Sequence, residues 1–283
     1  MKIFADNLFQ DKVAIVTGGG IGIGLAIARE LGSLGAKVAI SGRKQEKLDA
    51  AEAELKERGI TVFSKTCDIR KPEEIEAFVD AVLAEFGRID ILVNNAGGQF
   101  PSPAEMISPN GFAAVVNNNL LGTWNMTHAV ATKWMIENGG GKICTITANM
   151  WKGFPGMVHT GAARAGVVNM TKTLATEWAK YKINVTSVAP GTIQSTGMKQ
   201  YPPELVATSR HAIPAKRLGS EEETAWAVAY MVSPAADFVT GETLSIDGGA
   251  QNWGDIWEVH DHVGGDEEAY QLTESYRDPT RKD

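Results

Sequence analysis

The sequence predicts a doubly wound α/β fold, in which a seven-stranded parallel sheet carries helices on both faces. Seven short apolar runs alternate with amphipathic segments of helical length. Strands that are separated by helices form right-handed βαβ units, and a parallel sheet that is covered on both faces has strands that are apolar throughout. The expected strands are 13–17, 37–41, 61–66, 89–93, 142–147, 183–188 and 244–246.

Length and composition favour one large domain. The chain has 283 residues, of which 43% are hydrophobic, and no linker, repeat or low-complexity tract precedes residue 250. We therefore predict a single domain over residues 1–250, followed by a tail at 251–283 that is rich in Asp, Glu and Gly. Two tail histidines, His260 and His262, lack a convincing third ligand, so we predict no metal site.

Charge and hydropathy exclude several functions. The formal net charge is -7 and the 27 Lys and Arg residues are scattered, which argues against a nucleic-acid partner. The first twelve residues have no continuous apolar core and no later run is long enough to span a bilayer, so we expect a cytoplasmic protein without a membrane partner. Cys67 and Cys144 fall within or beside expected strands, which favours reduced, structural thiols.

A glycine-rich loop joins the first expected strand directly to an apolar-periodic helix. Glycines at such a junction let the backbone turn sharply and approach a pyrophosphate, while free N–H groups at the start of the helix bind the anion. This context predicts a Rossmann-like dinucleotide site. Its expected cofactor-binding residues are Gly18, Gly20, Ile21, Gly22, Ile23 and Gly24.

The residues after the second expected strand favour NADPH over NADH. An NAD-selective site usually places a carboxylate there to hold the ribose 2′-hydroxyl, whereas this chain has Ser41, Arg43 and Lys44. A guanidinium at Arg43 can form two bonds to a 2′-phosphate, with a further bond from Ser41 and added charge from Lys44. The alternative is that Arg43 and Lys44 simply open a solvated helix.

These motifs resemble the short-chain dehydrogenase/reductase family over residues 8–250. The loop spacing Thr-Gly-x-x-x-Gly-x-Gly is similar to the family's, and a run Asn-Asn-Ala-Gly follows the fourth expected strand. The resemblance implies that Asn119, on a central helix, supports that helix and an ordered water. It also implies cofactor contacts from Asp68 and Ile69 at the adenine, from the backbone at Asn95, Ala96 and Gly97, and from Pro190, Gly191 and Ile193 beside the nicotinamide.

The position of the family's Tyr-x-x-x-Lys pair is occupied by Thr160 and Arg164. Reduction of a ketone needs a phenol, with a pKa of about 10, that protonates the forming alkoxide. Threonine cannot do this, and arginine stays protonated but can still hold the nicotinamide ribose hydroxyls. The surrounding Gly-Ala-Ala-Arg-Ala-Gly run resembles trans-2-enoyl-CoA and 2,4-dienoyl-CoA reductases, which implies an acyl-CoA substrate and a place in fatty acid metabolism.

Conjugate reduction explains the changed pair, because hydride addition to an enoyl thioester forms an enolate that needs hydrogen-bond donors more than an acid. Counting back from Thr160 places Thr147 at the family's substrate-binding serine. Aligning the strand instead places Ala148 there and leaves Asn149 as the nearest polar group. We expect Thr147 and Thr160 to be the main donors, with Asn149 second in rank, and Arg164 to hold the cofactor.

The resemblance also implies a substrate lid over residues 194–218 and a homotetramer that buries the long central helices. Four lid cations could bind the CoA phosphates: Lys199, Arg210, Lys216 and Arg217. Two alternatives remain open. The protein could be a 3-ketoacyl or other carbonyl reductase with atypical catalytic residues, or a catalytically silent NADP-binding subunit.

Overall fold

The computed structural model describes residues 3–195 and 203–252. Lys199 of the expected lid, the tail histidines His260 and His262, and all of residues 253–283 lie outside the described residues.

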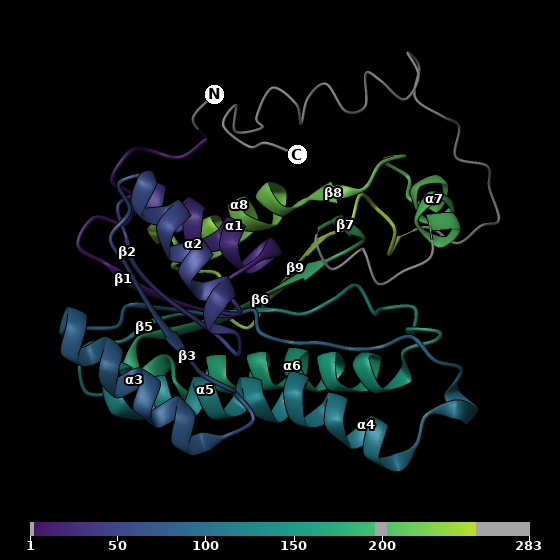
Figure 1. Cartoon of the computed structure of the whole chain (residues 1–283), viewed down its shortest axis with the longest axis horizontal. Helices are drawn as coiled ribbons and strands as arrows, with labels where there is room; N and C mark the ends of the chain where they lie inside the picture. Colours follow the sequence, from purple (N-terminus) through teal and green to yellow (C-terminus); the bar gives the residue numbers. More distant parts are fainter. Residues whose placement is uncertain (1–2, 196–202, 253–283) are drawn as a thin grey trace.

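A seven-stranded parallel sheet with the order β3-β2-β1-β4-β5-β6-β9 forms the centre of the domain (Figure 1). This confirms the predicted fold class, and each expected strand begins and ends within two residues of the observed one. The strand order reverses between β1 and β4, and ligands of doubly wound sheets bind at the carboxyl ends of the strands beside that point. The strands are β1 (Val13–Thr17), β2 (Lys37–Gly42), β3 (Val62–Thr66), β4 (Ile91–Asn94), β5 (Gly141–Ile146), β6 (Ile183–Pro190) and β9 (Thr243–Ile246).

Helices cover both faces of this sheet (Figure 1). One face carries α1 (Gly22–Ser33), α2 (Gln45–Glu57) and α8 (Glu221–Val232). The other carries α3 (Pro72–Phe86), α5 (Gly122–Val130) and α6 (Val158–Glu177). Side chains of a strand alternate between the faces, so β1 contributes Ala14 and Val16 to one apolar cluster and Val13 and Ile15 to the other.

The two cysteines belong to different clusters. Cys144 of β5 packs in the cluster beneath α1, α2 and α8, and Cys67 packs in the cluster beneath α3, α5 and α6. Burial raises the pKa of each thiol to about 12, so both stay protonated at neutral pH. Both are free and buried, which confirms the structural interpretation.

A long helical segment runs from α4 (Pro109–Val116) through α5 to Met135 and contains two π-helical turns, Asn117–Leu121 and Ala131–Met135. Ser108 caps its start by accepting a hydrogen bond from Gly111 N at 3.1 Å. A π turn inserts one extra residue into the helix and is frequent at functional sites. The first of them holds Asn119.

The segment after β6 contains short elements that the apolar pattern did not predict. Strand β7 (Ile193–Gln194) pairs with β8 (Gly219–Ser220), and α7 (Pro203–Ala212) lies between them in the chain. Single 3-10 turns occur at Ala104–Met106, Ala179–Tyr181 and Pro234–Ala236. Within the described ranges, no helix has both the length and the apolar character needed to cross a membrane.

Candidate active site

The glycine-rich loop is shaped for close approach to a ligand. Gly18 has a φ of 67° and Gly22 a φ of 59°, which are left-handed conformations that suit glycine. A Cβ at Gly24 would overlap Gly18 O and lie 2.8 Å from Gly18 C, so α1 can pack against the loop only with glycine there. Helix α1 begins after Ile21 without a side-chain cap or an acidic residue in its first turn. Its first N–H groups therefore remain available to an anion.

Thr17 connects this loop to the end of β4. Its hydroxyl accepts hydrogen bonds from Asn95 N and Ala96 N, both at 3.0 Å. The Asn95 amide in turn donates to Thr17 O at 3.0 Å and Gly18 O at 3.3 Å. The Asn-Asn-Ala-Gly run thus braces the glycine loop from the neighbouring strand, which brings the predicted residues Gly18, Asn95 and Ala96 together.

The residues predicted to select NADPH lie at the end of β2. Ser41 is buried, and its hydroxyl has no hydrogen-bond partner within the described parts of the chain. Arg43 and Lys44 are both exposed, and Lys44 precedes α2 without capping it through its side chain. An anionic group such as a 2′-phosphate would accept a hydrogen bond from the Ser41 hydroxyl and would pair with the two cations. The arrangement therefore fits NADPH.

Asp68 has a partner that sequence reasoning missed. Arg70 donates to the Asp68 carboxylate through Nε at 2.8 Å and 3.1 Å and through Nη2, and these bonds are the largest cause that lowers the pKa of Asp68 to about 2. The charge of Arg43 lowers this pKa further. Ile69 is buried, and its side chain packs against Gly122. A Cβ added at Gly122 would lie only 2.8 Å from Ile69 Cδ1. The Ile69 side chain therefore packs inside the fold.

Arg164 lies four residues after Thr160 on α6, and only 6% of it is exposed. Its Nη1 has no hydrogen-bond partner among the residues that the structure describes. Burial lowers the pKa of Arg164 to about 10, so the guanidinium is still charged at neutral pH. A buried charge with an unpaired donor is costly alone, and ribose hydroxyls at this place would offset that cost.

Asn119 and Arg164 meet at Gly97. A Cβ at Gly97 would overlap Arg164 Nη2 and lie 2.6 Å from Asn119 Oδ1. The Asn119 amide donates to Gly98 O at 2.7 Å and to Val115 O at 3.0 Å, and its oxygen accepts from Gly98 N at 3.2 Å. Through Asn119, the first π turn is therefore hydrogen-bonded to the loop after β4. The Arg164 guanidinium contacts this loop at the neighbouring residue, Gly97.

Thr160 is paired with the preceding residue, His159. The Thr160 N–H donates to His159 Nδ1 at 2.8 Å, and Thr160 Oγ1 lies 3.2 Å from the same nitrogen. The other ring nitrogen, Nε2, has no hydrogen-bond partner among the residues that the structure describes. His159 is fully buried, with its ring 4.6 Å from the Phe100 ring and 6.4 Å from the Phe112 ring, and burial lowers its pKa. The imidazole is thus uncharged at neutral pH.

The end of β5 gives Thr147 and Asn149 different partners. The Thr147 hydroxyl donates its single hydrogen to Val188 O at 3.1 Å, inside the sheet. This geometry does not support the donor role expected for Thr147, because no second hydrogen remains. Asn149 N donates to Pro190 O at 2.9 Å, so its backbone lies beside Pro190 and Gly191, the pair expected to flank the nicotinamide. Gly191 N in turn donates to Ile246 O at 3.1 Å.

Three of the lid cations proposed for CoA phosphates bond within the fold. Arg217 donates to Glu223 through Nη1 at 2.9 Å and through Nη2 at 2.6 Å, and Glu223 also completes the capping box of α8. Arg210 Nε donates to Lys216 O at 3.2 Å, and Lys216 Nζ donates to His211 O at 3.1 Å. Arg217 is thus already engaged in an ion pair, and its contact with a CoA phosphate stays a prediction.

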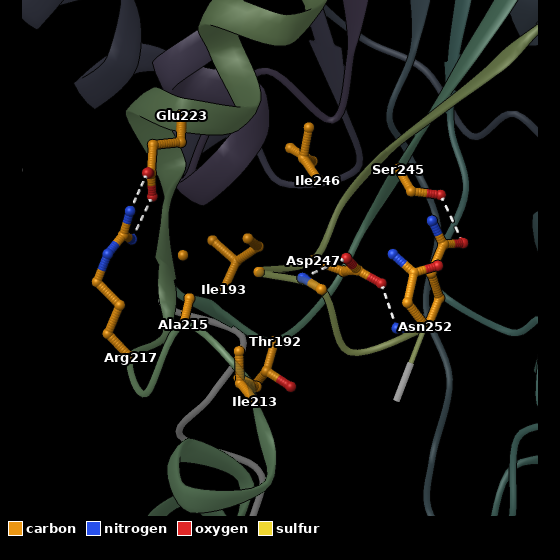
Figure 2. A pocket seen from close by; sticks show the side chains of 14 residues that line it. Thr192, Ile193, Ile213, Ala215, Arg217, Glu223, Ser245, Ile246, Asp247 and Asn252 are labelled. Atoms are coloured by element: carbon orange, nitrogen blue, oxygen red, sulfur yellow. Dashed lines mark hydrogen bonds and ion pairs between the residues drawn. The ribbon is translucent and has the colours of Figure 1, made fainter. Parts of the chain in front are cut away.

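A cavity of about 420 Å³ lies between β7, β8 and the turn that follows β9 (Figure 2). Ile193 and Ile246 line its apolar side, while Asp247 and the Arg217–Glu223 pair supply its polar rim (Figure 2). Ile193, predicted beside the nicotinamide, is buried and forms part of this wall.

The model of the family described as enoyl-(acyl carrier protein) reductase matches residues 19–251. This match covers most of the chain, and it includes the glycine loop from Gly19 onward and the Thr160–Arg164 pair. The chain belongs to the short-chain dehydrogenase/reductase family. It is therefore an NAD(P)H-dependent reductase, and the resemblance that the motifs indicated is confirmed.

Two similar proteins are both named 2,4-dienoyl-CoA reductases. Over 253 residues the chain is 39% identical to a peroxisomal 2,4-dienoyl-CoA reductase of Danio rerio, a match that covers 88% of this chain and 84% of the relative. It is 36% identical over 245 residues to a probable 2,4-dienoyl-CoA reductase of Bacillus subtilis (strain 168), covering 85% of this chain and 96% of the relative.

Solved structures show the same fold. The citronellol catabolism dehydrogenase of Pseudomonas aeruginosa PAO1 superimposes with a TM-score of 0.81 at 44% identity, covering 88% of this chain and 99% of that one. A variant of actinorhodin polyketide ketoreductase, solved with NADPH, gives a TM-score of 0.83 at 34% identity, covering 88% of this chain and 100% of that one.

Proposed function

We propose that this oxidoreductase uses NADPH to reduce the 2,3-double bond of an enoyl-CoA-type thioester. The observation that carries the proposal is the buried pair Thr160 and Arg164, one helical turn apart on α6. This pair keeps a hydroxyl and a ribose-binding cation but has no group that can protonate an alkoxide at neutral pH.

NADPH, when bound, supplies the hydride. The residues fit it through two orphaned groups, the Ser41 hydroxyl and Arg164 Nη1, and through the uncapped start of α1. Arg43 and Lys44 would hold the 2′-phosphate, and Arg164 would orient the nicotinamide ribose. The ketoreductase neighbour that was solved with NADPH supports the same cofactor.

The chemistry needs little acid catalysis. Hydride addition at Cβ moves the π electrons of the double bond toward the thioester carbonyl, and an enolate forms. Hydrogen-bond donors then stabilise the negative oxygen, and a proton from water adds to Cα. Preorganised donors are worth about 3 kcal/mol each in studied oxyanion holes, so a site with hydrogen-bond donors but no acid suits this step better than ketone reduction.

The names of the relatives favour a conjugated variant of the same substrate. Proteins that are 36–39% identical to this chain are called 2,4-dienoyl-CoA reductases. Adding hydride at C5 of a 2,4-dienoyl thioester extends the enolate by one double bond, and protonation at Cα gives a 3-enoyl product. The donors at the thioester oxygen have the same task in both reactions.

Product analysis with 4-deuterated NADPH tests the proposal. We expect deuterium at Cβ of a saturated product from trans-2-enoyl-CoA, or at C5 of a 3-enoyl product from 2,4-dienoyl-CoA. A matched 3-ketoacyl-CoA should react much more slowly. Good turnover of the ketoacyl substrate with inert enoyl substrates would show carbonyl reduction instead. Tight NADPH binding with no turnover of any substrate would identify a silent cofactor-binding subunit.

We further propose a homotetramer in the cytoplasm. Leu121 and Trp124 on the long central helix are 46% and 36% exposed, and large apolar side chains on one helix are suited to burial between subunits. Fractionation of cells that express the protein tests the location.

A further inference from the structure

Three side chains of the loop between β5 and α6 bond to β9 or to the turn that follows it. Asn149 Nδ2 donates to Asp247 Oδ2 at 2.7 Å. Trp151 Nε1 donates to Ser245 Oγ at 3.1 Å, and Lys152 Nζ donates to Ala250 O at 3.1 Å. Of the three, Asn149 lies nearest the end of β5, where the family binds its substrate.

The carboxylate of Asp247 is placed to accept a hydrogen bond from the Asn149 amide. Only 8% of the residue is exposed, and besides Asn149 its carboxylate accepts from Gly249 N at 2.9 Å and Gln251 N at 2.8 Å (Figure 2). Three N–H donors make it an acceptor toward Asn149. An acceptor can pair only with the NH₂ end of the amide, so Asp247 decides which end of Asn149 faces it.

The number of unused hydrogens distinguishes Thr147 from Asn149 as the candidate donor to the thioester oxygen. Thr147 has donated its hydroxyl hydrogen to Val188 O, and Ala148 has no polar side chain. The NH₂ group of Asn149 has two hydrogens, and Asp247 uses one. Its second hydrogen has no partner within the described residues, and Asn149 is partly exposed.

The backbone of Asn149 is fixed as well. Its N–H donates to Pro190 O at 2.9 Å, in the motif expected to flank the nicotinamide. A donor that is held both at its main chain and at its side chain needs little reorganisation when negative charge develops nearby, which is the property that makes such donors effective.

We propose that Asn149 is a further catalytic residue, whose amide donates its second hydrogen to the thioester carbonyl oxygen and is oriented by Asp247. The inference rests on the proposed function. It assigns to Asn149 the task of the family's serine, and it makes Asp247 a positioning residue.

Steady-state kinetics on a trans-2-enoyl-CoA test this with Asn149→Ala and a matched control, Trp151→Phe. The control removes a neighbouring bond from the same loop, to Ser245 of β9, but leaves the amide in place. We expect Asn149→Ala to lower kcat by about 100-fold with an unchanged Kd for NADPH, and Trp151→Phe to change kcat by less than about threefold. Equal effects of the two substitutions, or a larger loss in Thr147→Val than in Asn149→Ala, would overturn the proposal.

A double-mutant cycle tests the role of Asp247. Asp247→Asn should reduce kcat in the same direction as Asn149→Ala, and the double variant should lose little more than Asn149→Ala alone, because the carboxylate acts through the amide. Additive losses would show that Asp247 acts independently. If Asp247→Asn does not fold, as judged by its melting temperature, the comparison of Asn149→Ala with Trp151→Phe still decides the assignment.

Binding measurements separate this inference from the proposed function. Calorimetry compares a saturated acyl-CoA thioester with its thioether analogue on the protein loaded with NADP⁺. Wild type should prefer the thioester by about tenfold, and Asn149→Ala should lose that preference. A wild type that turns over no enoyl substrate but shows this change refutes the proposed function alone. An unchanged preference in Asn149→Ala refutes the assignment alone.

Discussion

Gly97 is the point at which Arg164 and Asn119 converge, and its replacement by alanine tests how the cofactor ribose is held. A Cβ there would overlap Arg164 Nη2 and lie 2.6 Å from Asn119 Oδ1. Ordinary contact needs about 3.5 Å, so one or both side chains must retreat by about 1 Å. Asn119 resists this movement, because three hydrogen bonds hold its amide.

Arg164 is therefore the side chain that we expect to move. Displacing a guanidinium removes hydrogen bonds to a charged donor, worth about 1.5–3 kcal/mol in total, which corresponds to a 10- to 100-fold weaker affinity for NADPH. Gly98→Ala is the matched control, because a Cβ at Gly98 would lie 3.4 Å from Asn118 Nδ2, in ordinary contact.

Fluorescence titration with NADPH measures both variants, and thermal denaturation checks that both fold. We expect Gly97→Ala to bind more weakly by the stated factor, while Gly98→Ala stays close to wild type. If the two variants bind NADPH equally well, Arg164 does not hold the cofactor in the way described.

Three other predictions concern charge, pH and assembly. Arg43→Ala should weaken NADPH by about 10- to 100-fold and NADH by much less, as measured by titration, whereas equal losses would remove Arg43 from the phosphate site. The pKa of His159 is lowered by burial, so the unfolded chain binds the proton first as the pH falls below about 6.5. Stability should therefore decrease in this acidic window, and His159→Gln should flatten the dependence of the unfolding free energy on pH; an unchanged slope would contradict this. Sedimentation should show a tetramer for wild type and a smaller species for Trp124→Glu, and a wild-type monomer would refute the assembly.

The strands and the nucleotide loop could be predicted because their physical causes are local. An apolar run such as the one at β1 can be buried on both faces only in a covered parallel sheet. The glycines at 18 and 24 follow a strand and open a helix, and the structure shows the close backbone approach that makes them necessary. In both cases neighbouring residues in the sequence contain the whole reason for the structure.

Partners that are distant in the sequence could not be predicted in this way. Asn149 and Asp247 are separated by 98 residues, and their hydrogen bond exists only because β5 and β9 flank β6 in the sheet. The bond from Thr147 to Val188 likewise depends on how β5 pairs with β6. Counting residues back from Thr160 could give the position of Thr147, but it could not reveal which acceptor takes the hydroxyl hydrogen.

The site also contains local features that composition does not reveal. Arg70 is two residues from Asp68, yet nothing in the spacing shows that it turns back onto the carboxylate. The π turn at Asn117–Leu121 has no clear sequence signal, because its residues are compatible with an ordinary helix. The fold was therefore easier to predict than the hydrogen bonds that orient the reacting groups.

The two buried thiols can report independently on the opening of the helical layers over the two faces of the sheet. Cys144 and Cys67 lie in the apolar layers on opposite faces of the sheet, and neither is ionised at neutral pH. An alkylating reagent reacts with the thiolate, so each cysteine is modified only when its own layer opens to solvent. Mass spectrometry of partially labelled protein would therefore reveal whether the helices of one face detach before those of the other or whether the two layers separate in a single cooperative event.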